Sequence, residues 1–301
     1  MENFAQLEYV MLLLIGSILL AVGLALISIK IAPDVGLMDI PGSAGHKKHL
    51  NSVPLTGGVV LLDTMIVMII LTKMWAIPDV WAIFVSGMII GLFGLLDDFI
   101  HLSATKKLLG QIAGTIVLIY LGVQVQFFHS PEFFIQVGEP WASWLNLIFT
   151  FLWLLTVTNS FNFIDSFDGL AVGLSSVSAG FFLLLAIVTG QTSLIFLCTV
   201  ILGICIALYF FNSRPASLFL GDSGAQSLGF LLAAVAIIYQ PKIGSQASSW
   251  FMPILIFSVP LFDMMLVVLS RLKRKKKIHQ ASRDHTYHRL AQRGIPIHHA
   301  V

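Results

Sequence analysis

The stretch YVMLLLIGSILLAVGLALISI, residues 9–29, contains no charged side chain. An α-helix rises about 1.5 Å per residue, so about 20 apolar residues cross the roughly 30 Å hydrocarbon core of a bilayer. The stretch therefore predicts a membrane-spanning helix. Glu2 and Glu8 precede it without any lysine or arginine, and no small-residue cleavage site follows, so we expect a retained span rather than a signal peptide.

Apolar runs of this kind recur along most of the chain. Its 301 residues are 57% hydrophobic and 11% charged, with a mean hydropathy of +0.92, whereas about 25% of residues are charged in an ordinary soluble domain. The candidate spans cover residues 9–29, 54–72, 79–96, 107–126, 142–158, 169–189, 192–211, 222–239 and 250–270. The sequence therefore predicts an all-α, polytopic bundle of about nine to eleven helices, with residues 1–270 forming the transmembrane part and residues 271–301 a basic cytoplasmic tail.

The basic residues are distributed unevenly between the two sides of these spans. If the N-terminus lies outside, 15 of the 17 lysines and arginines fall on the inner side, and only Lys73 and Lys242 fall outside. Cytoplasmic loops of membrane proteins carry this excess, so the bias predicts the orientation. The basic run 271–277 is interpreted as an anchor on anionic lipid, and we expect no nucleic-acid partner.

The aspartates collect on the same side as the basic residues. Asp97 and Asp98 are adjacent at the inner end of a span and are followed by Lys106 and Lys107. Paired carboxylates can hold a hard divalent cation, and a nearby lysine suits phosphate; a solvated helix end is the structural alternative. Because acids near membrane depth are costly, such a cluster usually marks an ion or substrate site.

Three further segments add polar groups on this side. Asn and Asp recur every third residue from Asn159 to Asp168, which places them on one stripe of a helix or helix start. Asp222 lies between Gly221 and Gly224 at the start of a span, where a helix N-terminus favours anions. An aspartate that only caps the helix would give the same sequence pattern. Two histidine-rich segments, residues 46–49 and 285–290, offer donors suited to a pyrophosphate.

Together these segments resemble the polyprenyl-phosphate N-acetylhexosamine-1-phosphate transferase family. The resemblance runs from about residue 33 to residue 293, and its motifs occur in the family's order. They are VGLMDIP (35–41), HKKH (46–49), LDD (96–98), NFIDSFDGL (162–170), FLGDSG (219–224), PLFD (260–263) and HTYHRL (285–290).

The resemblance implies roles for the acidic residues. Asp97 and Asp98 would form a catalytic acidic pair, with Asp98 activating the polyprenyl phosphate. Asn162 and Asp165 would line the metal and phosphate site, and Asp165 and Asp222 would bind Mg²⁺, with Mn²⁺ as the alternative metal.

The resemblance also implies substrate-binding residues. Asp168 would lie near the uracil, and the phosphates or the sugar would be held by Lys47, His49, Lys107, His285, His288 and Arg289. Many members have a third aspartate where this chain has His101, so no metal role is expected at that position.

The implied activity is transfer of N-acetylhexosamine 1-phosphate, with N-acetylglucosamine as the favoured sugar, from a UDP-sugar to undecaprenyl phosphate. The expected enzyme is a multi-pass protein of the bacterial cytoplasmic membrane whose active site faces the cytoplasm, and a homodimer is left open. Within the family, the peptidoglycan enzyme that uses UDP-N-acetylmuramoyl-pentapeptide is the alternative. A transporter is the alternative from another class, but transporter sites lie near the bilayer midplane, whereas only Asp63 and Asp263 fall within the expected spans.

Overall fold

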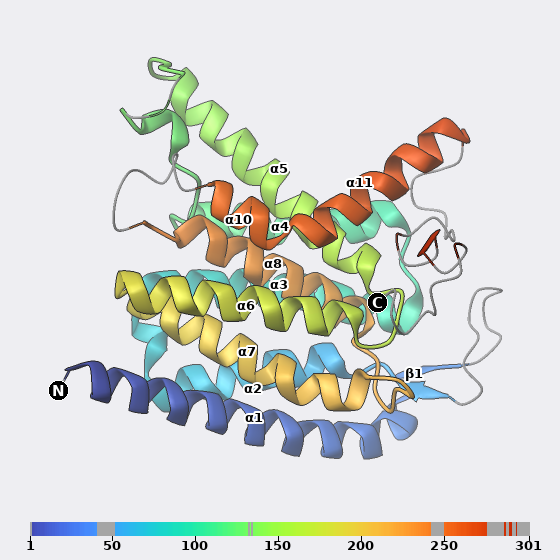
Figure 1. Ribbon diagram of the computed structural model, residues 1–301. Coiled ribbons are helices and arrows are strands. Elements are labelled where there is room, and N and C mark those ends of the chain that lie inside the picture. Colours follow the sequence, from blue (N-terminus) through green and yellow to red (C-terminus); the bar gives the residue numbers. More distant parts are fainter. Residues whose placement is uncertain are drawn as a thin grey trace.

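A computed structural model gives the fold (Figure 1) and describes residues 2–40, 52–131, 133, 135–241, 250–275, 286, 289, 290 and 293. These residues form ten α-helices, two short 3₁₀ turns and one pair of two-residue antiparallel strands. The helices are α1 (Glu2–Val35), α2 (Gly57–Thr72), α3 (Pro78–Ile100), α4 (Ala104–Tyr120), α5 (Trp141–Ile164), α6 (Leu170–Thr189), α7 (Thr192–Asn212), α8 (Gly221–Ile238), α10 (Phe251–Ile256) and α11 (Ser258–Lys273). The turns are η1 (Met74–Ala76) and η2 (Phe127–His129), and the strands are β1 (Met38–Asp39) and β2 (Val53–Pro54).

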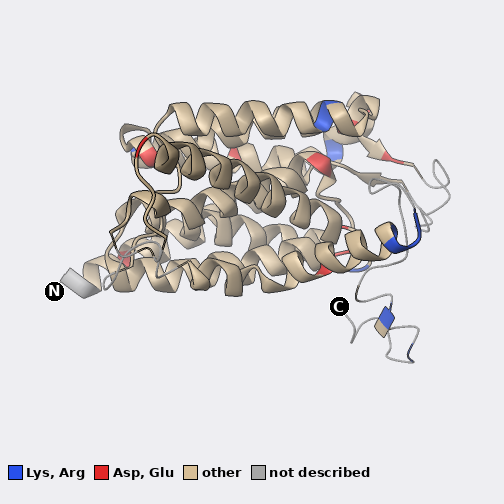
Figure 2. Ribbon diagram, turned by 90° about the horizontal axis from the view of Figure 1, so that it is seen from above, with Lys and Arg blue, Asp and Glu red and all other residues tan. Residues whose placement is uncertain are grey.

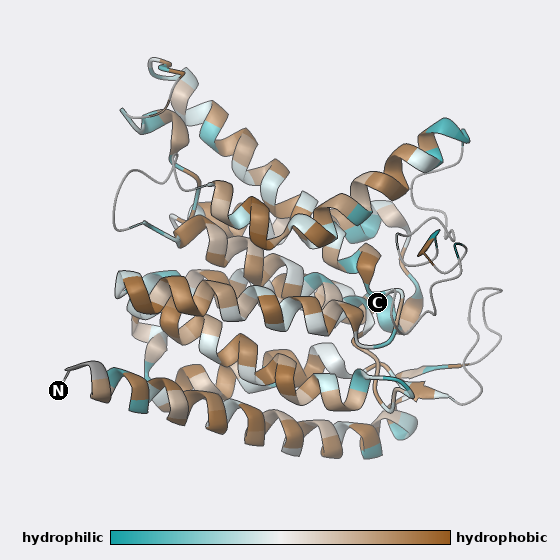
Figure 3. Ribbon diagram, in the orientation of Figure 1, coloured by the Kyte–Doolittle hydropathy of each residue, from teal (hydrophilic) through white to brown (hydrophobic). Residues whose placement is uncertain are grey.

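Six of these helices, α1, α3, α5, α6, α7 and α8, are long and apolar enough to cross a membrane. Large hydrophobic side chains are exposed along α1, α3, α5 and α6, and hydrophilic residues gather mainly at helix ends and in loops (Figure 3). A soluble protein would instead bury its apolar faces. The predicted all-α membrane bundle is confirmed, and the chain is a multi-pass membrane protein.

The last predicted span, residues 250–270, is wrong as a single helix. The chain breaks at Phe257 between α10 and α11. Pro260 lies in the first turn of α11, where a proline is tolerated, but it lacks the N–H that would bond to the carbonyl four residues earlier. The proline therefore favours a new helix start at this point. Helix α11 packs against α5 and then extends away from the bundle, in a different direction from α5 (Figure 1).

Helix α8 lies at the centre of the bundle and packs against α2, α3, α5 and α6. The close packing depends on glycine. A Cβ atom on Gly94 of α3 would lie 2.5 Å from the Cα of Ser223, and one on Gly58 of α2 would also overlap Ser223. Because these two glycines let α2 and α3 approach the backbone of α8, the first turn of α8 is fixed between them.

The segment before α8 is tied to the start of α2. Gly57 and Gly58 donate backbone hydrogen bonds to the carbonyls of Phe219 and Leu220, both at 3.0 Å. Figure 2 shows that most of the described lysines and arginines lie at the end of the bundle where α8 begins, opposite the N-terminus. The charge separation expected from the sequence is therefore present in the fold.

Candidate active site

Asp98, near the end of α3, caps the first turn of α8. Its Oδ1 accepts the backbone N–H of Asp222 at 2.7 Å, and its Oδ2 accepts the N–H and the hydroxyl of Ser223 at 3.1 and 2.7 Å. Gly221 has a positive φ of 72° and passes so close to this carboxylate that a side chain would overlap it. The carboxylate thus compensates the positive end of the α8 dipole from a different helix.

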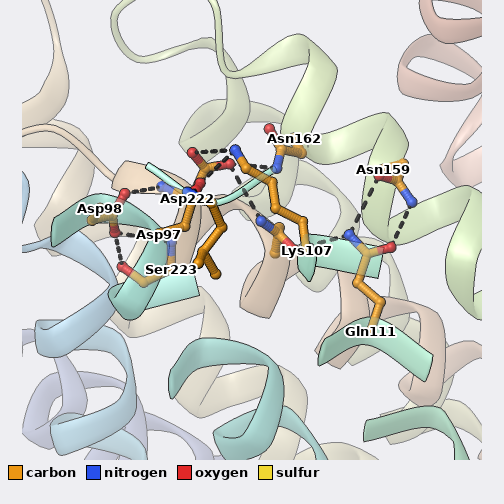
Figure 4. A network of polar contacts seen from close by, with 10 residues as sticks. Asp97, Asp98, Lys107, Gln111, Asn159, Asn162, Asp222 and Ser223 are labelled. Carbon is orange, nitrogen blue, oxygen red and sulfur yellow. Dashed lines mark hydrogen bonds and ion pairs between the residues drawn. The ribbon is translucent and has the colours of Figure 1, made fainter. Parts of the chain in front are cut away.

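Asp222 is the acid on which donors from three other positions converge (Figure 4). Its Oδ1 accepts a hydrogen bond from the Asn162 side chain at 2.8 Å and one from Gln226 at 3.3 Å. Its Oδ2 accepts one from the Lys107 Nζ at 3.1 Å. The first turn of α8, the last part of α5 and the first turn of α4 therefore meet at this carboxylate.

Lys107 of α4 connects an aspartate of α3 with an aspartate of α8. Its ammonium group forms ion pairs with Asp97 and with Asp222. Asp97 is only 2% exposed, and its other oxygen accepts the backbone N–H of Leu102 at 2.5 Å. A buried charge needs a partner, and Lys107 supplies a cation to both carboxylates.

Asp165 follows α5 directly and lies near the same group of acids. Its pKa is raised to about 8, first by burial and then by repulsion from Asp222, Asp98 and Asp168. Within the described part of the chain, its carboxylate has no hydrogen-bond partner. An added positive charge at this place would therefore favour the ionised form of Asp165.

No three His, Cys, Asp or Glu side chains converge on one point as a complete metal site among the described residues. Mg²⁺, however, keeps several waters and binds through one or two carboxylates together with substrate phosphates. Asp222 and Asp165 with the Asn162 amide form a donor set dominated by oxygen, which fits Mg²⁺ or Mn²⁺. His101 is exposed at the end of α3.

The structure brings together five of the predicted site residues by direct contact: Asp97, Asp98, Lys107, Asn162 and Asp222. Asp165 and Asp168 lie close enough to join them electrostatically. Lys47, His49, His285 and His288 lie outside the described residues, and their roles stay predictions.

Thr286, a described residue of the C-terminal tail, contacts the bundle. Thr286 donates two hydrogen bonds of 2.7 Å, from its backbone N–H and its hydroxyl, to Asp263 in α11. Asp263 is only 3% exposed, so this motif aspartate attaches the tail to the bundle. Arg289 is half-buried, and its substrate role stays a prediction.

Two glutamines were not singled out from the sequence. Gln111 in α4 and Gln226 in α8 are 3% and 2% exposed and hydrogen-bond to each other at 2.9 Å. Each lies four residues after a site residue, Lys107 and Asp222, so it shares a helix face with that residue. This spacing is the signal that would have found both.

Comparison with known proteins supports the resemblance. The pattern that defines glycosyl transferase family 4 matches residues 80–240. A protein of Bacillus subtilis (strain 168), named "Probable undecaprenyl-phosphate N-acetylglucosaminyl 1-phosphate transferase", is 30% identical over 266 residues, which cover 88% of this chain and 73% of that protein.

Relatives with a second name are also similar. A phospho-N-acetylmuramoyl-pentapeptide-transferase of Lacticaseibacillus paracasei is 33% identical over 65% of this chain and 64% of its own length. One of Latilactobacillus sakei is 28% identical over 83% of this chain and 79% of its own length. The family pattern over residues 80–240 covers nearly all of α3 to α8, and these helices carry the acids, the lysine and the amides of the site. The chain therefore belongs to glycosyl transferase family 4.

Proposed function

We propose that this protein transfers N-acetylglucosamine 1-phosphate from the UDP-sugar to undecaprenyl phosphate and releases UMP. The observation that carries the proposal is the cluster of Asp98, Asp222, Lys107 and Asn162 at one end of a membrane bundle. The choice of sugar follows the name of the Bacillus subtilis relative, whose match covers more of both chains than that of the Lacticaseibacillus paracasei enzyme.

The cluster suits phosphoryl transfer, which depends on positioning and charge neutralisation more than on covalent chemistry. A UDP-sugar brings a pyrophosphate and a polyprenyl phosphate brings a second anion. Lys107 is 30% exposed at its side chain, so its ammonium group can reach a phosphate while it remains paired with an aspartate. The N-terminus of α8 adds the partial positive charge of its backbone N–H groups.

We propose Mg²⁺ as the cofactor, with Asp222, Asp165 and Asn162 as the residues that would hold it. When bound, the ion would neutralise the pyrophosphate and stabilise the charge that develops on the leaving UMP. The raised pKa of Asp165, at about 8, supports this assignment because a cation would offset both causes of the shift, burial first and then repulsion from the neighbouring aspartates.

Asp98 is proposed to act on the acceptor phosphate. A carboxylate has about four lone-pair positions, and three donors already engage this one. The remaining position can take a proton from the acceptor phosphate or orient it, so that its oxygen attacks the sugar-bearing phosphorus. A two-step route through an aspartyl intermediate is the alternative mechanism.

The proposed setting is the bacterial cytoplasmic membrane, with the active site facing the cytoplasm. The gathering of basic residues at the α8 end supports this orientation. The lipid acceptor would reach the site from the surrounding bilayer, and the water-soluble UDP-sugar from the cytoplasm.

One assay tests the activity and the sugar together. Purified protein is incubated with undecaprenyl phosphate and, separately, UDP-N-acetylglucosamine, UDP-N-acetylgalactosamine and UDP-N-acetylmuramoyl-pentapeptide, and the released nucleotide is identified. We expect UMP, fastest with UDP-N-acetylglucosamine. Fastest release with the pentapeptide donor would favour the peptidoglycan reaction, UDP as the sole product would contradict sugar-phosphate transfer, and no nucleotide release would favour a transporter.

A further inference from the structure

A row of hydrogen-bonded side-chain amides runs inward from the candidate site. Asn159 of α5 bonds to Gln111 of α4 (Figure 4), Gln111 bonds to Gln226 of α8, and Gln226 bonds to the Asp222 carboxylate. The two glutamines are almost fully buried within the bundle. Burying several amides in a membrane bundle is costly unless their N–H and C=O groups are hydrogen-bonded.

The direction of every hydrogen bond between these amides is determined by the orientation of Asn159. The Asn159 Nδ2 lies 2.8 Å from the backbone carbonyl of Leu155, which can only accept. The Asn159 NH₂ group must therefore face that carbonyl, and the same group donates to the Gln111 Oε1 at 2.8 Å. The Asn159 Oδ1 in turn accepts from the Gln111 Nε2 at 3.3 Å.

This orientation is passed on to the site. With its oxygen facing Asn159, Gln111 uses its remaining N–H to donate to the Gln226 Oε1 at 2.9 Å. The Gln226 carbonyl is thereby directed away from the site, and its NH₂ group points to the Asp222 Oδ1 at 3.3 Å. If the amide were flipped, its carbonyl oxygen would face the carboxylate and repel it.

The consequence for Asp222 is an unequal use of its two oxygens. Oδ1 receives both Asn162 and Gln226, which matches its two lone pairs. Oδ2 receives Lys107, whose ammonium group also pairs with Asp97, and the Asp97 carboxyl lies within hydrogen-bonding range of Asp222. The Oδ2 atom thus faces the side of the site where a cation already lies, and the hydrogen-bonded amides hold the carboxylate in that rotation.

We propose that Gln111 and Gln226 are positioning residues that orient Asp222 for its cation. The proposal rests on the proposed role of Asp222 as a Mg²⁺ ligand. Residues that orient metal ligands typically contribute about 10–100-fold to metal affinity, so a loss of that size is expected when either glutamine is removed.

The test compares Gln111→Met and Gln226→Met, which keep side-chain length but remove the amide. Thr115→Val and Ser227→Ala are the matched controls. These residues lie on the same two helices, are 0% exposed, and their hydroxyls have no hydrogen-bond partner among the described residues. Two quantities are measured for each purified variant: the Mg²⁺ concentration for half-maximal UMP release, and the Mg²⁺-dependent rise of the thermal unfolding midpoint in detergent.

Both Met variants should need about 10–100-fold more Mg²⁺ in the two measurements, and excess Mg²⁺ should restore most of the rate. The controls should follow the wild-type protein. Because the two glutamines act through the same series of hydrogen bonds, the double variant should show the same shift in Mg²⁺ requirement as either single variant. If each substitution only disturbed packing independently, the two shifts would add. If a Met variant does not fold, Gln226→Asn keeps the amide but shortens its reach by one methylene, and the same shift is expected.

Mg²⁺ curves of the Met variants that coincide with those of the controls would overturn this proposal, and so would an additive double variant. Failure of the proposed function is seen separately, because it would appear as a wild-type protein that releases no UMP. In that case, the thermal measurement still reports whether the glutamines affect cation binding.

Discussion

At the scale of single residues, Asp222 is the acid whose replacement should change metal dependence most. Asp222→Asn places an NH₂ group against either the two amide donors or the Lys107 ammonium, so it loses a charge and a correct hydrogen bond together. We expect the Mg²⁺ concentration for half-maximal rate to rise by more than the roughly 10–100-fold that follows from losing a residue that only orients a metal ligand. A Mg²⁺ titration of UMP release measures this shift.

Two comparisons make the Asp222 prediction specific. Asp98→Asn should abolish turnover at every Mg²⁺ concentration, because it removes the group proposed to act on the acceptor. His101→Asn should keep most of the activity, since His101 is exposed and asparagine tolerates its positive φ of 51°. An Asp222→Asn protein with an unchanged titration would remove this residue from the metal site.

If Asp165 binds the metal as proposed, its raised pKa makes metal binding depend on pH. Its pKa of about 8 lies above the usual value, so in the folded protein without metal the carboxyl holds its proton up to about pH 8. A metal ligand must be deprotonated, so the apparent Mg²⁺ affinity should rise up to about tenfold per pH unit below pH 8 and level off above it.

The same shift predicts how stability changes with pH. Between the ordinary Asp pKa of about 3.9 and about 8, the folded state holds more protons than the unfolded state, so raising the pH destabilises the metal-free protein. Thermal unfolding in chelator should show a midpoint that falls toward pH 8, and Mg²⁺ should reduce the fall. Asp165→Asn should weaken both trends, most of all near pH 8, and unchanged trends in that variant would assign them to another group.

At the scale of the helices, the approach of α3 to α8 is the packing contact that the site needs. In Gly94→Ala, the new methyl group would meet the Ser223 backbone N at 2.7 Å and the Asp222 carbonyl carbon at 2.9 Å, neither of which can move aside as a flexible side chain could. The helices must separate, and the Asp98 hydrogen bonds to α8 lengthen. We expect a loss of stability of about 1–3 kcal/mol and a larger proportional loss of activity.

Gly23→Ala in α1 is the matched control for this prediction. A Cβ atom there meets nothing within 4 Å, so its effect on stability should stay within about 1 kcal/mol. Detergent-solubilised thermal unfolding and UMP release are measured on both variants. Equal behaviour of the two would show that the close contact between α3 and α8 is dispensable.

At the scale of the whole molecule, the orientation in the membrane can be tested with single cysteines. The two native cysteines, Cys198 and Cys205, are buried and free, so they should not react with a membrane-impermeant maleimide. Lys273→Cys, exposed at the end of α11, should be labelled only after cells are permeabilised, and Ser143→Cys, exposed at the opposite end of the bundle, should be labelled in intact cells. The reverse pattern would place the acidic cluster outside the cytoplasm.

Much of the architecture follows from the sequence because its causes are local. The length of an apolar run determines whether a helix can cross a bilayer, and the positions of lysine and arginine determine its direction. Eight of the nine predicted spans therefore correspond to single helices. The predicted span 250–270 is instead two helices, because the apolar run contains two prolines, Pro253 and Pro260, that hydropathy alone does not distinguish from helix-forming residues.

The site was predictable as a set of residues but not as a geometry. The acids, Asn162 and Lys107 were found from their motifs and their common side of the membrane. The tertiary structure alone decided that Asp98 caps α8, that Lys107 joins Asp97 to Asp222, and that Gln111 and Gln226 lead to that carboxylate. The physical reason is distance along the chain: Lys107 and Asp222 are 115 residues apart, and only the packing of both α4 and α8 against α3 and α5 brings such groups within hydrogen-bonding range.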